Sequence, residues 1–177
     1  MKKLITLALV FVLALAACAS IASADALSTR GVNWYTSPSA LQRLHGHTDP
    51  YRNGRFAWYS YQGAVPGRNT TLKFIYHDDA LVLTEYFFYY NNGEDPFVRT
   101  LNELERHYGQ SECLYNEKEL TRILEVTGYM SPQPFSPYYW VAADGTRIYL
   151  FFELYTFDYS VLFVEPEYYW MAMNTNY

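Results

Sequence analysis

The chain has 177 residues with 13 basic and 18 acidic side chains, a formal net charge of −5. It has no basic run, which excludes it from the proteins that bind nucleic-acid phosphate through Lys and Arg. Its length predicts one domain or two small halves. Aromatic residues make up 19% of the chain, and 19 residues are Tyr. Such side chains fill a core or form a binding surface.

The N-terminus has the pattern of an export signal. Lys2 and Lys3 precede a charge-free apolar run at residues 4–17. This run is shorter than the about 20 residues of a membrane span and is typical of a signal-peptide core. We therefore expect residues 1–24 to be a signal peptide and the mature protein to be extracytoplasmic.

Two cleavage patterns overlap in this signal. Residues 15–18, Leu-Ala-Ala-Cys, resemble a lipobox, which would make Cys18 the lipidated first residue of a cell-surface lipoprotein. Residues 22–24, Ala-Ser-Ala, resemble an ordinary signal-peptidase site, which would release a secreted protein. The small apolar residues between them favour the second cut. Contact with a membrane is expected only through a lipid at Cys18, which requires the first cut. In the form released by the second cut, Cys113 is the single cysteine.

The first half of the mature chain reads as a helix, three strands and a second helix. Ser37 followed by Pro38 predicts the start of a short helix. Apolar and aromatic alternation predicts strands at residues 55–62, 71–77 and 81–90. The spacing of apolar residues then predicts a helix at residues 96–108, which Gly109 ends.

The second half repeats this order of elements. A helix is expected from Asn116 to Gly128, with Glu119 in a capping-box position. A proline-rich loop and three strands follow, the strands at residues 138–142, 146–154 and 159–165. The aromatic tail beyond them has no assigned structure.

An offset of 79 residues aligns the two halves, and the implied unit is a helix followed by a three-stranded meander. The expected fold is α+β, with helices packed on antiparallel β-meander sheet. The expected parts are residues 29–110 and 111–177, either as two tandem halves or as one continuous domain, 29–177.

The opening and the first long helix resemble a known group of sequences. Val32, Trp34, Ser37 and Leu41 fit an [IV]-x-W-x-x-S-x-x-x-[VL] pattern. A helix end with Leu104, Tyr108 and Gly109 fits L-x-x-x-Y-G. Both are similar to small, uncharacterised exported proteins of Gram-positive bacteria. The order of elements also resembles BamE/SmpA-like lipoproteins and the β-lactamase inhibitory protein. Those proteins act by protein contact, and this resemblance implies a binding role.

The strand aromatics are the candidate binding residues. In a sheet with one buried face, the other face should be polar, but residues 85–90 (EYFFYY) are aromatic on both sides. Either both faces are covered, or one face exposes rings for recognition. The residues proposed for such a face are Trp58, Tyr59, Tyr61, Tyr86, Tyr89 and Trp140.

Other candidate sites have less support in the sequence. His45 and His47, with Asp49 nearby, form a weak metal-site candidate in a loop. Three strand glutamates, Glu85, Glu153 and Glu165, would serve a hydrolase only if two of them lay about 5–10 Å apart in a cleft. The sequence indicates no cofactor and no catalytic constellation.

The function expected from these patterns is that of an exported, non-catalytic protein-binding module that uses an aromatic sheet face. The alternative is a carbohydrate- or cell-wall-binding protein that uses the same rings. A hydrolase is third. The expected partner is a protein or an extracellular polysaccharide.

Overall fold

The computed structural model describes residues 31–90, 96–113, 118–127, 134–153 and 156–174. The predicted signal peptide at residues 1–24, with Cys18, lies outside these residues. Val32–Tyr177 forms one compact unit.

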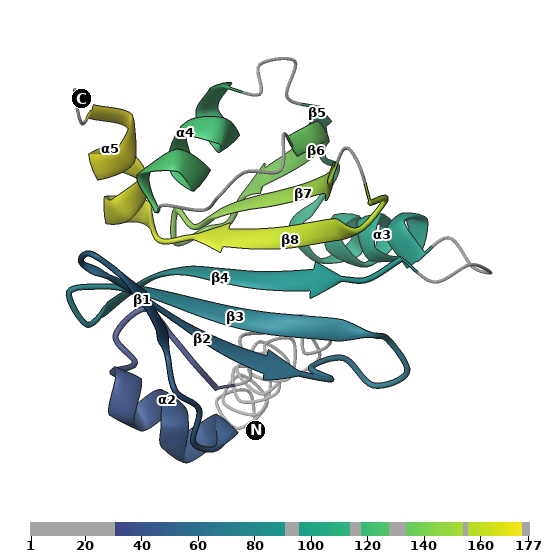
Figure 1. Cartoon of the computed structure of the whole chain (residues 1–177). Helices are drawn as coiled ribbons and strands as arrows, with labels where there is room; N and C mark the ends of the chain where they lie inside the picture. The colour runs from purple at the N-terminus through teal and green to yellow at the C-terminus, as the bar shows by residue number, and fades with distance from the viewer. Residues whose placement is uncertain (1–30, 91–95, 114–117, 128–133, 154–155, 175–177) are drawn as a thin grey trace, which may run out of the picture. The chain divides into compact units, whose positions relative to one another are not determined.

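An antiparallel sheet of eight strands is the frame of this unit (Figure 1). In chain order its strands are β1 (Tyr51–Asn53), β2 (Phe56–Gln62), β3 (Thr70–His77), β4 (Ala80–Phe88), β5 (Glu112–Cys113), β6 (Pro134–Val141), β7 (Arg147–Glu153) and β8 (Tyr159–Val164). Their spatial order is β1-β2-β3-β4-β8-β7-β6-β5. Two meanders therefore meet at the centre, where β4 pairs with β8 and Tyr86 lies opposite Val161.

Four described helices accompany the sheet: α2 (Pro38–His45), α3 (Pro96–Tyr108), α4 (Lys118–Val126) and α5 (Pro166–Asn174). The predicted cap of α2 is present, since Ala40 N donates to Ser37 Oγ at 3.3 Å. Glu165 caps α5 in the same way by accepting from Tyr168 N at 2.6 Å. The predicted α+β fold with a meander sheet is confirmed.

Some local predictions are corrected by the structure. The proline-rich segment expected to be a loop already contributes to β6, which begins at Pro134 and contains a register irregularity between Phe135 and Tyr138. This irregularity shifts the pairing within a strand that carries Pro137. The unassigned aromatic tail forms most of α5. The short edge strands β1 and β5 were not predicted, because two or three residues carry no readable alternation.

Alternating side chains give the sheet two faces. One face, here called the α4 face, has a buried cluster in which Ile75, Tyr149 and Leu162 meet Leu120 and Ile123 of α4. The opposite face, here called the α2/α3 face, has other partners. There the His45 ring of α2 lies 5.2 Å from the ring of Phe74, and Phe97 of α3 lies 3.9 Å from the ring of Phe152.

The two helices that the 79-residue offset aligns therefore lie on opposite faces of the sheet. Leu41 of α2 is buried on the α2/α3 face. Leu120, Ile123 and Leu124 of α4 are buried on the other. If a two-fold axis related the two halves, it would pass between the antiparallel strands β4 and β8, perpendicular to the sheet. Such an axis would leave both helices on the same face of the sheet. The internal correspondence is thus confined to the two meanders.

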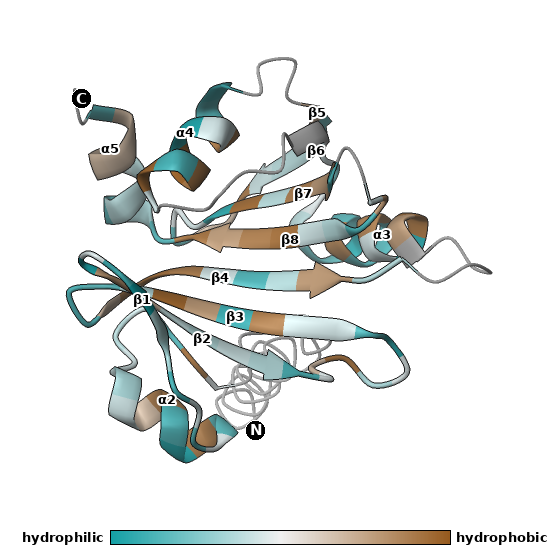
Figure 2. Cartoon of the chain, viewed as in Figure 1, coloured by the Kyte–Doolittle hydropathy of each residue, from teal (hydrophilic) through white to brown (hydrophobic). Residues whose placement is uncertain are grey.

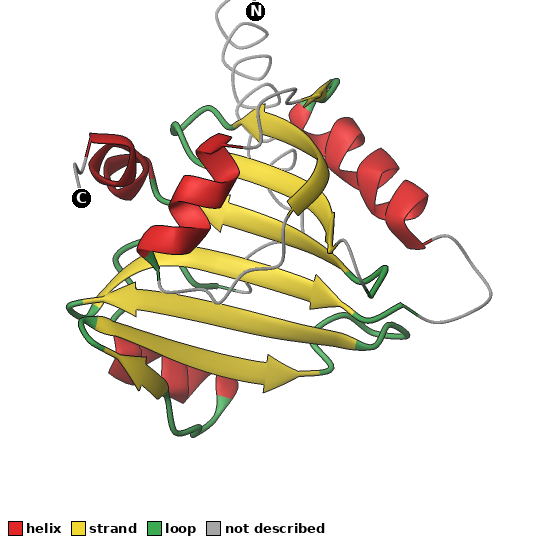
Figure 3. Ribbon diagram, turned by 45° about the horizontal axis from the view of Figure 1, so that its top comes forward, coloured by secondary structure: helices red, strands yellow, loops and turns green. Residues whose placement is uncertain are grey.

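The α4 face is only partly covered by described helices. Figure 3 shows α4 over the strands of the second meander, whereas the broad surface of the first meander turned to the viewer carries no helix. At one end of that surface Tyr168 of α5 reaches Phe56, with 6.4 Å between ring centroids. Toward the other end, Ser60 and Gln62 are exposed. We call this exposed region the open half of the α4 face.

Candidate functional site

The structure buries most of the aromatic residues proposed as a binding face. Their exposed fractions are 8% for Trp58, 3% for Tyr59, 0% for Tyr86 and 4% for Trp140. Tyr61 is half-buried, and only Tyr89 is exposed, at 38%. The prediction that these six side chains form one exposed face is therefore corrected: in the folded chain, four of them belong to its interior.

Packing on both faces explains this burial. Trp58 joins the cluster under α4, while its neighbour Tyr59 points to the α2/α3 face, where its ring lies 5.5 Å from that of Tyr76. Trp140 donates its indole N–H to the carbonyl of Gly109 at 2.9 Å and so ties the end of α3 to β6. Tyr61 donates to the carbonyl of Gly46 at 3.2 Å, next to the end of α2.

Three exposed rings instead lie together at the end of β4, beside the start of β8, whereas the exposed rings of Tyr35, Tyr51 and Trp170 lie elsewhere. Tyr89 is joined there by Tyr90, exposed at 49%, and Phe157, exposed at 66%. The Phe87 ring, half-buried on the α4 face, lies 4.8 Å from the ring of Tyr89, and the Tyr90 ring lies 6.1 Å from that of Phe157. We call Phe87, Tyr89, Tyr90 and Phe157 the aromatic rim.

Hydrogen bonds hold the rim in place. The Tyr89 hydroxyl lies 3.2 Å from Thr71 Oγ1, which itself donates to Gln62 Oε1 at 2.9 Å. Tyr90 N donates to Asp158 Oδ1 at 2.7 Å, so the residues after β4 are fastened to the turn before β8. The Tyr89 ring, fixed by its hydroxyl, therefore loses little conformational freedom when a partner binds.

Phe157 has an unusual backbone for an exposed aromatic residue. Its φ is +59°, in the left-handed region that favours Gly and Asn. The residue is two-thirds exposed, so burial of its ring offsets little of the strain. Strained residues of this kind concentrate at functional sites. The sequence signal for this site was an aromatic residue, Phe157, in the short link before β8. It was not selected from the sequence, nor were Tyr90 and Phe87.

A charged cluster lies beside the rim on the α4 face. Figure 2 shows hydrophilic stretches that interrupt the hydrophobic colour of β3 and β4. Lys73 Nζ lies 2.9 Å from Glu85 Oε2 and 4.9 Å from the centre of the Phe87 ring. Ser160 donates to Glu85 Oε1 at 2.7 Å. The nearly buried Glu85 carboxylate is thus hydrogen-bonded and paired, as a charge in a sheet interior must be.

Glu153, at the end of β7, completes the cluster. Desolvation and the nearby negative charge of Glu85 raise the pKa of its carboxyl to about 7, with a further contribution from Asp158, while Lys73 opposes the shift. Within the described part of the chain, the Glu153 side chain makes no ion pair. We call Lys73, Glu85, Glu153 and Asp158 the charged cluster.

The other predicted sites have structural partners. His47 hydrogen-bonds Gln42 at 3.0 Å and lies 3.6 Å from Asp49, whereas His45 packs against Tyr61 and Phe74. No group of three His, Cys, Asp or Glu residues among those described is arranged to hold a metal ion. Of the three strand glutamates, Glu165 serves as the cap of α5.

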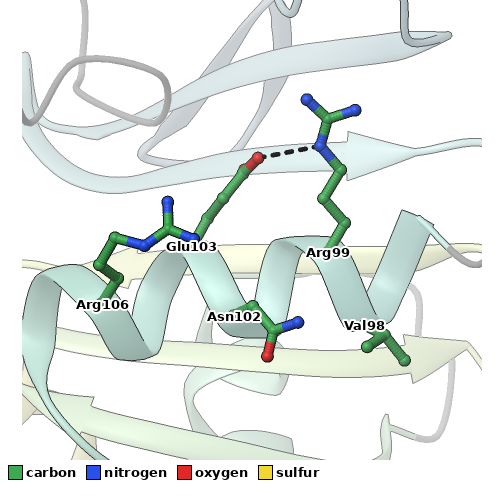
Figure 4. Close-up of a pocket in the computed structure, with 5 residues that line it drawn as sticks. All are labelled: Val98, Arg99, Asn102, Glu103 and Arg106. Atoms are coloured by element: carbon green, nitrogen blue, oxygen red, sulfur yellow. Dashed lines mark hydrogen bonds and ion pairs between the residues drawn. The ribbon is translucent and has the colours of Figure 1, made fainter.

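A pocket lies elsewhere, along the outer side of α3 (Figure 4). Its described lining is Val98, Arg99, Asn102, Glu103 and Arg106, all from this one helix. Glu103 accepts from Arg99 Nε at 3.2 Å and from Arg68 at 3.1 Å, so much of the positive charge here is compensated. None of the predicted site residues lines it.

Comparison with protein-family models, with curated proteins and with solved structures finds no match for this chain. The resemblance to exported Gram-positive proteins stays a prediction. No helix among the described residues has both the length and the apolarity to cross a membrane.

Proposed function

We propose that this chain is an exported, non-catalytic protein-binding module whose partner contacts the aromatic rim and the adjoining open half of the α4 face. The observation that carries the proposal is Phe157, an exposed aromatic ring on a left-handed backbone, beside the exposed rings of Tyr89 and Tyr90. Tyr and Phe are enriched in protein interfaces, and exposed apolar patches rimmed by polar groups indicate interaction sites.

A protein partner is favoured over a polysaccharide by the arrangement of the rings. Sugar polymers stack on rows of rings that share a plane. Here the Phe87 and Tyr89 rings are inclined at 74°, and the Tyr90 and Phe157 rings at 48°. Inclined rings with a charged cluster beside them suit the mixed apolar and polar surface of a protein.

Catalysis has less support. Glu165 is occupied as a helix cap, and Glu85 is held by Lys73 and Ser160. The proposed location outside the cytoplasm rests on the N-terminal sequence pattern of residues 1–24.

Photocrosslinking in the native cells tests this function. A benzophenone side chain is placed at Ser60, an exposed β2 position on the open half, and in a separate strain at Tyr35, which is 96% exposed. We expect a discrete protein adduct from position 60 and none of that mass from position 35. Tyr89→Ala combined with Phe157→Ala should abolish the adduct from position 60, whereas Tyr35→Ala, a change of an exposed tyrosine just before α2, should not.

Two results would contradict the proposal. An adduct that survives loss of both rim rings would show that the partner does not depend on the aromatic rim. An adduct that consists of polysaccharide would replace the protein partner with a wall or matrix polymer.

A further inference from the structure

We propose that the partner presents a basic side chain, Lys or Arg, to this surface and that Glu153 receives it while the aromatic rim packs around its stem. This inference rests on the proposed function and names the chemistry of the partner. It depends on the charge balance, the hydrogen-bond partners and the ring positions of the open half.

The charged cluster carries surplus negative charge. It contains three carboxylates, those of Glu85, Glu153 and Asp158, and one cation, Lys73. Lys73 is already engaged by Glu85 at 2.9 Å and lies over Phe87. The whole chain adds to this bias with its net charge of −5. A complementary partner surface therefore carries positive charge.

Glu153 is the carboxylate of the charged cluster that can form an ion pair with a partner. Both oxygens of Glu85 have contacts, one with Lys73 and one with Ser160. One oxygen of Asp158 accepts from Tyr90 N. Glu153 has no such ion-pair partner among the described residues and is half-buried at the end of β7.

The electrostatic state of Glu153 points in the same direction. The groups that face it are Glu85 of β4, Lys73 of β3 and Asp158 before β8, and desolvation and the two carboxylates raise its pKa to about 7. An incoming ammonium or guanidinium would stabilise the ionised form, so binding would release a proton from Glu153. Complex formation should therefore strengthen between pH 6 and pH 8.

The aromatic rim supplies the remaining contacts. Long basic side chains bury their methylene stems against apolar surface, and cations are attracted to ring faces. Lys73 already shows this geometry within the chain, with Nζ 4.9 Å from the Phe87 ring centre. Tyr89 and Phe157 offer exposed rings at the same end of the central strands, after β4 and before β8.

The test uses the crosslink from position 60 in the full-length protein. Glu153→Gln should lower the adduct yield about fivefold to tenfold, and Glu153→Lys should abolish it. Glu125→Gln and Glu125→Lys are matched controls on the exposed side of α4 and should leave the yield unchanged. Thermal melts accompany each variant, because Glu153→Gln is expected to stabilise the fold, so a lost adduct cannot be ascribed to unfolding.

Charge reversal provides the decisive readout. Mass spectrometry locates the crosslinked segment of the partner, and each Lys or Arg in it is changed to Glu. One of these changes should restore the adduct with Glu153→Lys and weaken it with the native chain. Failure of every reversal to restore it, or an unchanged yield with Glu153→Gln, overturns the inference. If the adduct still needs Tyr89 and Phe157, the proposed function stands alone; if it does not, both fail.

Discussion

The backbone strain at Phe157 can be measured by comparing two substitutions at that position. Phe157→Ala and Phe157→Gly both remove the ring and its contact with Tyr90, 6.1 Å away. Only Ala keeps a Cβ at φ +59°. The difference in stability between the two variants therefore isolates the cost of the left-handed backbone from the loss of the ring.

The expected size follows from two opposing terms. A left-handed conformation costs a residue with a Cβ roughly 1–2 kcal/mol. Glycine avoids that cost but loses more freedom on folding, worth roughly 0.5–1 kcal/mol. We therefore expect the glycine variant to have a free energy of unfolding about 1 kcal/mol higher than the alanine variant. In a domain of this size that difference raises Tm by about 2–4 °C.

Urea unfolding followed by far-ultraviolet circular dichroism is the assay, with Tm measured in parallel. Equal stability of the two variants, or a more stable alanine variant, would refute the argument that the site stores strain. The crosslink from position 60 should weaken in both variants, since both lack the ring. If the glycine variant is more stable than the native chain but gives a weaker crosslink, then the Phe157 ring is retained at a cost to the stability of the fold.

Three further substitutions test separate parts of the structure. Thr84 is buried in β4, and its hydroxyl has no hydrogen-bond partner among the described residues, so Thr84→Val should raise the free energy of unfolding by about 1–2 kcal/mol; a lower value would mean that the hydroxyl is satisfied in solution. Asp79 has φ +65° in the two-residue β3–β4 turn, where Asp78 is also left-handed. This is the type I′ arrangement that favours glycine, so Asp79→Gly should stabilise by about 0.5 kcal/mol in urea titrations, and a loss would argue against this turn type. Glu153 has a folded pKa of about 7, raised from 4.5, so its contribution to stability should decline as pH rises from about 4.5 to 7, because the folded state holds the proton that the unfolded state has released. Glu153→Gln should therefore stabilise the protein by about 1 kcal/mol at pH 8, after allowance for solvent screening of a half-buried group, and have little effect at pH 4; an equal effect at both values would contradict the shift.

The fold was predictable where periodicity and turn chemistry act locally. Ser37 and Pro38 marked the start of α2, and alternation marked β2, β3 and β4 within two residues of their ends. The order of strands was not predictable, because the pairing of β4 with β8 joins residues 71 to 81 positions apart and local patterns carry no information on such contacts.

The candidate site was less predictable than the fold, for a physical reason. An aromatic residue in a strand looks the same in sequence whether a helix covers it or not, so Trp58 and Tyr86 could not be separated from Tyr89. Burial depends on which face α4 and α3 pack against. The backbone angle of Phe157 and the proximity of Glu153 to Glu85 depend likewise on the assembled sheet.

The central seam between β4 and β8 also bears on how the chain folds. The three strands of the first meander lie within residues 56–88, so β4 has a long, largely apolar unpaired edge until residues 159–164 are added. Non-local pairing of this kind slows folding, and an unpaired edge can pair with a second chain. A chain that ends before residue 159 should therefore aggregate rather than stay folded as an isolated half, so the last strand governs the solubility of the first meander.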